Sequence, residues 1–186
     1  MLHGVVGFGN ENALKYPKFL FCGSFNPMHN GHIAIIDYIY AKYKFPIDLE
    51  ISLNNVDKPS IDLDEVWKRH KQIMSLSKPS FGNLYITDNA RYLEKANILP
   101  NVTFVCGFDT MKDLCESRHY KEEKFEQVVR DFIKLRITWL VFPRHKGDGT
   151  ISKLEDFKGV SKTLLSSIKF ASDFEPVKIS SRELRK

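Results

Sequence analysis

Residues 23–32 read GSFNPMHNGH, and they separate two segments whose apolar residues recur at different spacings. The run KFLFC before them, residues 18–22, is short and apolar, as is typical of a buried strand. After them, isoleucines and tyrosines recur at helical spacing from Ile33 to Tyr43. Two glycines and a proline lie in the stretch itself and favour a turn. The stretch therefore predicts a strand, a glycine-containing turn and the start of a helix.

The same alternation of strand and helix continues along the chain. Five further runs rich in Val, Ile and Phe predict strands at residues 47–53, 84–87, 102–106, 137–142 and 168–171. Helical spacing predicts a helix capped by Asp62 or Asp64, with a stripe of Val66, His70, Ile73 and Met74, and another helix over residues 125–133. This order predicts an α/β fold with a mostly parallel sheet and helices on both faces. Ligands of such sheets bind beyond the carboxyl ends of the strands, where residues 23–32 lie.

Length and composition predict one domain. The 186 residues suffice for a single core, so we expect one domain over residues 1–186, with residues 1–16 as a flexible extension before the first strand. No apolar run approaches the roughly 18 residues that cross a bilayer, and the N-terminal stretch does not resemble a signal peptide. Cys22, Cys106 and Cys115 form no C-x-x-C pair, which favours a reducing compartment without structural zinc. We therefore expect a cytoplasmic protein.

The net charge of +5 favours an anionic partner. The basic residues are scattered among acidic ones and form no block of five or six like charges. We therefore expect neither nucleic acid nor a membrane as a partner. The charge alone does not identify the anion, and the alternative is that the excess only keeps the protein soluble. The sequence leaves homo-oligomerisation open.

The residue types in the stretch 23–32 suit a phosphate. Gly23 and Gly31 let the backbone approach a ligand, and the start of a helix supplies unpaired N–H groups. His29 and His32 are three residues apart and lie on one helix face, so both can donate hydrogen bonds to one phosphate. Two alternatives are surface histidines on a capped turn, or a zinc pair completed by His70, His119 or His145. The position between a strand and a helix start favours phosphate.

Two other segments carry residues that suit a nucleotide. Gly107 and Asp109 follow the predicted strand 102–106, where Asp109 can accept hydrogen bonds from ribose hydroxyls or cap a helix. Near the end of the chain, Ser180 begins a capping-box pattern whose helix start contains Arg182 and Arg185. Arginines at a helix start suit a polyphosphate. Both segments follow a predicted strand of the sheet.

The stretch GSFNPMHNGH resembles the G-x-F-(D/N)-P-x-H-x-G-H signature of the HxGH nucleotidyltransferase superfamily, which is cytidylyltransferase-like. Its GSFNP form most resembles the nicotinamide and nicotinate mononucleotide adenylyltransferases. The resemblance implies a Rossmann-like, HUP-type nucleotidyltransferase fold in which His29 and His32 are catalytic and stabilise the α-phosphate during in-line attack. It also implies that the stretch binds the nucleotide, through Gly23, Ser24, Phe25 and Gly31.

The resemblance extends to other segments. It implies nucleotide binding by Gly107, Asp109, Ser180, Ser181 and Arg182, and a catalytic role for Arg185 on the β- and γ-phosphates. Lys58 and Arg69 resemble basic positions that bind the phosphate of the acceptor. Arg182 stands where the family usually has threonine, and the tryptophan near the G-x-D segment is not evident.

The resemblance predicts a reaction in NAD biosynthesis. ATP would transfer AMP to nicotinamide or nicotinate mononucleotide, giving NAD or deamido-NAD and diphosphate, with Mg2+ bound through the triphosphate and no dedicated metal site. One alternative keeps the chemistry and pairs CTP with a phosphoalcohol or ATP with phosphopantetheine; Asn26 argues against both, because those families usually have aspartate there. Another is a nucleotide-binding module without catalysis. A tRNA synthetase is not expected, since the chain has no lysine-rich KMSKS segment.

Overall fold

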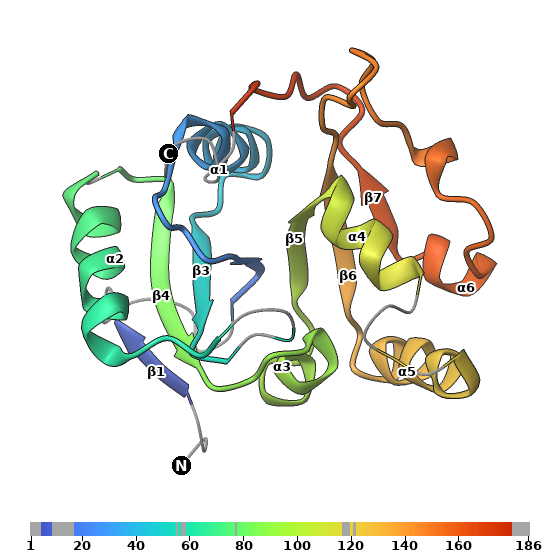
Figure 1. The fold of residues 1–186 in the computed structure, drawn as a ribbon, viewed down its shortest axis with the longest axis horizontal. Coiled ribbons are helices and arrows are strands. Elements are labelled where there is room, and N and C mark those ends of the chain that lie inside the picture. Colours follow the sequence, from blue (N-terminus) through green and yellow to red (C-terminus); the bar gives the residue numbers. More distant parts are fainter. Residues whose placement is uncertain are drawn as a thin grey trace.

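A seven-stranded sheet forms the centre of the molecule (Figure 1). The computed structural model describes residues 5–8, 17–54, 56, 59–76, 78–116, 120 and 122–179. The strands are β1 (Val5–Phe8), β2 (Phe19–Cys22), β3 (Ile47–Ser52), β4 (Phe81–Thr87), β5 (Thr103–Gly107), β6 (Thr138–Phe142) and β7 (Ile168–Phe170). Their spatial order is β1-β4-β3-β2-β5-β6-β7, in which six strands are parallel and β1 pairs antiparallel with β4. The predicted Rossmann-like sheet is confirmed.

Helices cover both faces of the sheet. They are α1 (Asn30–Tyr43), α2 (Leu63–Ser75), α3 (Tyr92–Ile98), α4 (Phe108–Cys115), α5 (Glu122–Lys134) and α6 (Lys162–Leu165), with a short 3-10 turn at Leu154–Asp156. Buried residues of α1 and α2 belong to one hydrophobic cluster, and those of α3 to α6 belong to another. None of the helices in the described part of the chain is long and apolar enough to cross a membrane.

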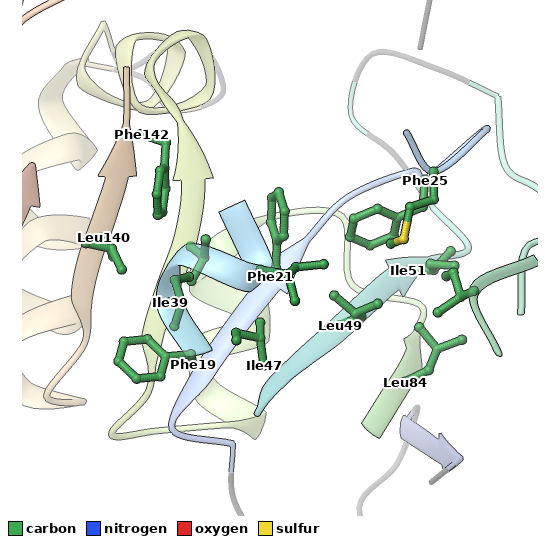
Figure 2. Packing of buried hydrophobic residues seen from close by; sticks show 14 of the residues in the cluster. Phe19, Phe21, Phe25, Ile39, Ile47, Leu49, Ile51, Leu84, Leu140 and Phe142 are labelled. Carbon is green, nitrogen blue, oxygen red and sulfur yellow. The ribbon is translucent and has the colours of Figure 1, made fainter. Parts of the chain in front are cut away.

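The alternation of side chains along β2 divides the core into these two clusters. Phe19 and Phe21 lie on the face covered by α1 and α2, whereas Leu20 lies on the opposite face with the other helices. Figure 2 shows Phe21 beside Ile39 of α1 and near Leu49 of β3. Burial on both faces explains why the central strands read as continuous apolar runs in the sequence.

The order of the strands creates a switch point between β2 and β5. From β2 the chain proceeds to β3 and β4 on one side, and then crosses to place β5 on the other side of β2. The segments that follow β2 and β5 therefore diverge at the carboxyl edge of the sheet, which is where sheets of this kind bind ligands. The stretch 23–32 follows β2 and leads directly into α1.

The sequence predicts six of the seven strands, with ends shifted by up to three residues. It misses β1, which lies within the segment expected to be an extension, and it misses the helices α3 and α6. It also misassigns the buried face of α2. Asp62 caps this helix, as one of the two expected positions, and Val66 is buried as expected. Met74, however, is 39% exposed, and the position that is buried in its place is Arg69.

Candidate active site

Two histidines cap the start of α1. The Nδ1 atom of His29 accepts a hydrogen bond from the backbone N–H of Gly31 at 3.1 Å, and the Nδ1 atom of His32 accepts one from the backbone N–H of His29 at 3.3 Å. This reciprocal pattern is a capping box in which both capping side chains are imidazoles. The capping bonds at the helix start thus orient both rings.

The capping bonds also fix which nitrogen of each ring carries the proton. A ring nitrogen that accepts a hydrogen bond carries no proton, so the proton of each neutral ring is on Nε2. The two rings stack with centroids 3.8 Å apart and an interplanar angle of 26°. Burial, and after it the charge of the neighbouring His29, lowers the pKa of His32 to about 3. His32 is therefore a neutral Nε2–H donor over the physiological range of pH.

Two aromatic side chains pack against the His32 ring. Phe21 and Phe25 contact it in edge-to-face geometry, with ring centroids 5.8 Å and 5.2 Å away. Phe25 is 1% exposed, and its φ of 44° lies in the left-handed region that few side chains other than glycine adopt. A Cβ atom on Gly23 would lie 2.9 Å from the Phe25 ring, so the glycine at position 23 is needed for this packing. Strained backbone that the core holds in place is common at functional sites.

Helix α2 holds the stretch 23–32 from the side. Asn26 Nδ2 donates to Glu65 Oε1 at 3.0 Å, and Arg69 Nη1 donates to the backbone oxygen of Ser24 at 2.9 Å. Two further N–H groups of Arg69 donate to Glu65 Oε1 at 3.0 Å and 2.9 Å. Gln72 accepts from the backbone N–H of Met28 at 3.4 Å. The sequence points to Arg69 but not to Glu65 or Gln72. The only signal for Glu65 is its spacing of four residues from Arg69, and Gln72 has none.

The position of Arg69 bears on its predicted role. The sequence assigns it to the phosphate of an acceptor, whereas the structure buries it to 7% exposure between Glu65 and Ser24. It does not line any of the cavities described below. In this state Arg69 positions the loop, and a contact with an acceptor phosphate would require it to change partners.

A cavity of about 650 Å³ lies over the carboxyl ends of β2 and β5. It is lined by most of the predicted nucleotide-binding residues that the structure describes: Gly23, Ser24, Phe25, His29, Gly31, His32 and Gly107. Its lining also includes the apolar residues Phe142, Phe174 and Val177 and the basic residues Arg144, His145 and Lys178. A pocket lined by both polar donors and apolar surface suits a nucleotide, which carries charged phosphates and a flat base. We call it the donor cavity.

Asp109 lies next to the donor cavity but is already paired. Gly107 is the N-cap of α4, so the alternative in which Asp109 caps this helix is wrong. The Asp109 carboxylate instead accepts a short hydrogen bond from the guanidinium of Arg144, which follows β6. Both residues line a cavity of about 410 Å³ that shares Arg144 and His145 with the donor cavity. The predicted contact of Asp109 with ribose stays a prediction.

A third cavity, of about 320 Å³, adjoins the donor cavity. The donor cavity and this third cavity share Cys22, Gly23, Ser24 and Thr110 in their linings. The other wall of the third cavity comes mainly from α3 and its surroundings, and includes Arg91, Tyr92, Lys95 and Tyr120. We call it the acceptor cavity. None of these four residues has a signal in the sequence, because α3 carries no motif and is too short for a clear periodicity.

A buried ion pair lies at the floor of the acceptor cavity. Lys95 Nζ is 2.8 Å from Glu50 Oε2, and Thr87 Oγ1 donates to Glu50 Oε1 at 2.6 Å. The two charged side chains are 8% and 1% exposed, so each one compensates the desolvation of the other. Burial, partly opposed by Lys95, raises the pKa of the neighbouring Cys22 thiol well above its usual range. Cys22 is therefore a protonated thiol and is not suited to be a nucleophile.

Five of the predicted site residues, Lys58, Ser180, Ser181, Arg182 and Arg185, lie outside the described residues. Ile179, which directly precedes Ser180, lines the donor cavity. Its Cγ2 atom is 3.2 Å from where a Cβ atom on Gly31 would lie. The described chain thus approaches the start of α1 at the point where the segment 180–186 follows. In the described part of the chain, no group of three His, Cys, Asp or Glu side chains could hold a metal ion.

The geometry at the edge of the sheet agrees with comparisons to known proteins. Residues 20–186 match the family model described as cytidylyltransferase-like. The chain belongs to the cytidylyltransferase-like family. This confirms the nucleotidyltransferase resemblance that the stretch 23–32 predicts. The match begins at β2 and includes the residues that line the donor and acceptor cavities of this cytidylyltransferase-like chain.

Two curated relatives carry names that specify a reaction. The chain is 28% identical over 182 residues to a Fervidobacterium nodosum protein named "Probable nicotinate-nucleotide adenylyltransferase", covering 90% of this chain and 78% of that protein. It is 24% identical over 161 residues to a Schizosaccharomyces pombe protein named "Putative nicotinamide mononucleotide adenylyltransferase", covering 82% of this chain and 64% of that protein. The two names differ only in the acid or amide form of the pyridine.

A solved structure has the same fold. It is Plasmodium falciparum nicotinic acid mononucleotide adenylyltransferase complexed with NaAD, and it superimposes with a TM-score of 0.55 over 90% of this chain and 81% of that chain. The sequences are 18% identical. At this identity the match supports the Rossmann-like fold alone.

Proposed function

We propose that this chain transfers the adenylyl group of ATP to nicotinamide or nicotinate mononucleotide, giving NAD or deamido-NAD and diphosphate. The observation that carries the proposal is the junction of two cavities at Gly23 and Ser24, directly beside the paired histidines. A transferase that joins two nucleotides needs two such sites that meet at the reacting phosphate. The names of both curated relatives support this substrate class.

In the donor cavity, the Nε2–H groups of His29 and His32 would donate to oxygens of the ATP α-phosphate. Negative charge builds up on these oxygens during phosphoryl and nucleotidyl transfer, and donors fixed in advance stabilise it without reorganisation. The capping box supplies this fixed orientation. An oxygen of the acceptor phosphate would then form the new bond to the α-phosphorus while the bond to the leaving diphosphate breaks. No covalent enzyme intermediate is needed.

The acceptor cavity would hold the pyridine mononucleotide. Tyr92 and Tyr120 offer aromatic surface for a flat ring, and Arg91 offers a cationic group, whereas the charge of Lys95 is already paired with Glu50. The predicted role of Lys58 on the acceptor phosphate belongs to this proposal, since Val56 of the same loop lines the cavity. Arg69 would contribute by holding Ser24 and Asn26 in place through Glu65.

The outer phosphates of ATP would lie toward the C-terminal segment. The approach of Ile179 to Gly31 supports this placement, because Ser180, Ser181, Arg182 and Arg185 follow Ile179 directly. Mg2+ would arrive on the triphosphate, whose oxygens and bound water would be its ligands. A cytoplasmic location, where ATP and pyridine mononucleotides are available, is part of the same proposal.

The proposal is tested by incubating the purified protein with Mg2+ and either ATP or CTP against a panel of acceptors. The panel contains both pyridine mononucleotides, phosphopantetheine, phosphocholine and glycerol phosphate, and products are separated by chromatography. We expect a pyridine dinucleotide with ATP. Asn30→Ala should retain this product, because Asn30 lies between the two histidines in the sequence but has an exposed side chain that does not line the donor cavity. Product with CTP or another acceptor would replace the proposal by that reaction. Binding of ATP without any product would indicate a non-catalytic nucleotide-binding module.

A further inference from the structure

Helix α2 carries an exposed apolar stripe on the side opposite the active-site loop. Leu63, Trp67 and Met74 are 60%, 43% and 39% exposed, although they are large hydrophobic side chains. The His70 ring contacts Trp67 edge to face, with centroids 5.2 Å apart. Single exposed apolar residues are common on protein surfaces, but a row of them along one helix marks an interaction surface.

The spacing within this stripe is that of a coiled-coil seam. The four positions 63, 67, 70 and 74 are separated by four, three and four residues, which is the alternation of core positions in a heptad repeat. Val66, Arg69 and Ile73 lie on the adjacent face of the helix and are buried in the protein. Helix α2 therefore uses one face for its own domain and presents a seam of two heptads to the outside.

Two opposite charges flank the seam. Asp64 and Lys71 are exposed, and each one follows a seam residue by one position, so both lie on the same side of the stripe. In an antiparallel pair of identical helices centred between Trp67 and His70, Asp64 of one helix lies opposite Lys71 of the other. The same contact then occurs twice across the two-fold axis. A parallel pair would instead place the Asp64 and Lys71 side chains of the two helices on opposite sides of the seam, so these contacts would not form.

We propose that α2 mediates a homodimer in which the helices of two copies pack antiparallel along Leu63, Trp67, His70 and Met74. The charge pattern favours a second copy of this chain because the stripe complements itself only in that arrangement. A seam of two heptads is short, so the dimer is expected to dissociate at micromolar concentrations. The loop contacts of Glu65 and Arg69 lie on the inner face of α2, so changes in the seam leave them in place.

The test is sedimentation velocity on the full chain over a range of concentrations from about 1 to about 200 µM. We expect a monomer–dimer equilibrium for the wild type and a monomer for Trp67→Glu. Asp64→Lys and Lys71→Asp each convert two attractive contacts into repulsive ones, and each should raise the dissociation constant about tenfold. The double variant Asp64→Lys, Lys71→Asp restores opposite charges and should restore the dimer.

A matched control is Lys134→Asp, which reverses an exposed charge at the end of α5 on the opposite face of the sheet. It should leave the equilibrium unchanged, and circular dichroism confirms that each variant is folded. A wild-type protein that stays monomeric throughout the range would overturn the proposal. So would a dimer that survives Trp67→Glu, or single charge variants that dimerise as well as the double variant.

Discussion

The backbone N–H of His29 donates to the Nδ1 atom of His32, while the rings of the two residues stack with centroids 3.8 Å apart. The capping bonds thus hold both imidazole rings at the start of α1. The arrangement leaves both Nε2 atoms as donors at the N-terminus of α1, where the helix dipole already favours an anion. It links a local feature of helix capping to the stabilisation of a phosphate.

The low pKa of His32 predicts how stability changes with pH. The unfolded chain protonates this ring below its ordinary pKa of 6.5, whereas the folded protein keeps it neutral until about pH 3. Between these values the unfolded state binds the additional proton, so stability decreases as pH falls, by up to about 1.4 kcal/mol per pH unit. His32→Gln should flatten this dependence between pH 6.5 and 4, as measured by urea unfolding at several values of pH.

The comparison with the His32 variant is needed because Asp48 titrates in the same window. Burial raises the pKa of Asp48 from 3.8 to about 6, so the folded state binds its proton first and Asp48 stabilises the protein as pH falls. The two effects oppose each other in the wild type. If wild type and His32→Gln show the same pH dependence, His32 is not held neutral in the folded state.

Removal of Glu65 should destabilise the protein and slow the reaction. Glu65→Ala leaves the buried Arg69 without its carboxylate partner, and breaking such a pair costs about 3 kcal/mol. Glu65→Gln keeps an acceptor and should retain more activity. Adding Arg69→Met to Glu65→Ala removes the unpaired charge, so thermal stability should recover while turnover stays low. Recovery of turnover together with stability would mean that this pair does not position Ser24 and Asn26.

The predicted contact between Asp109 and ribose can be tested with nucleotide analogues. If the carboxylate leaves Arg144 to accept hydrogen bonds from ribose hydroxyls, the wild type should prefer ATP to deoxyribose analogues by kcat/KM. Asp109→Ala should lose most of this preference, about tenfold for one hydrogen bond to a charged group. An unchanged preference would restrict Asp109 to its observed role as the partner of Arg144.

Arg91 provides a test of the acceptor cavity. Its guanidinium lies 5.9 Å from the centroid of the Tyr120 ring, and both residues line this cavity. Arg91→Ala should raise KM for the pyridine mononucleotide about tenfold while KM for ATP changes little. Steady-state kinetics with each substrate varied in turn separates the two effects. An equal rise in both values would argue against a separate acceptor cavity.

The sequence predicts the parts of the site that one continuous stretch encodes. Residues 23–32 contain the strand end, the turn, the cap and both histidines, so their position can be inferred from spacing alone. The acceptor cavity depends on α3, a helix of seven residues whose buried members include Lys95 rather than a regular apolar stripe. The burial of Arg69 is not predicted for a similar reason, because a charged residue on a helix is usually exposed, whereas here Glu65 and Ser24 compensate its burial; its role on an acceptor phosphate stays a prediction.

Direct transfer of the adenylyl group is tested by following the α-phosphate of ATP. The protein is mixed with ATP labelled at the α-phosphate and a pyridine mononucleotide, and label is measured in the dinucleotide and on the protein. We expect label in the dinucleotide alone. His32→Ala should form it about 100-fold or more slowly than the wild type or Asn30→Ala. Label bound to the protein during turnover, or an unchanged rate in His32→Ala, would contradict this expectation.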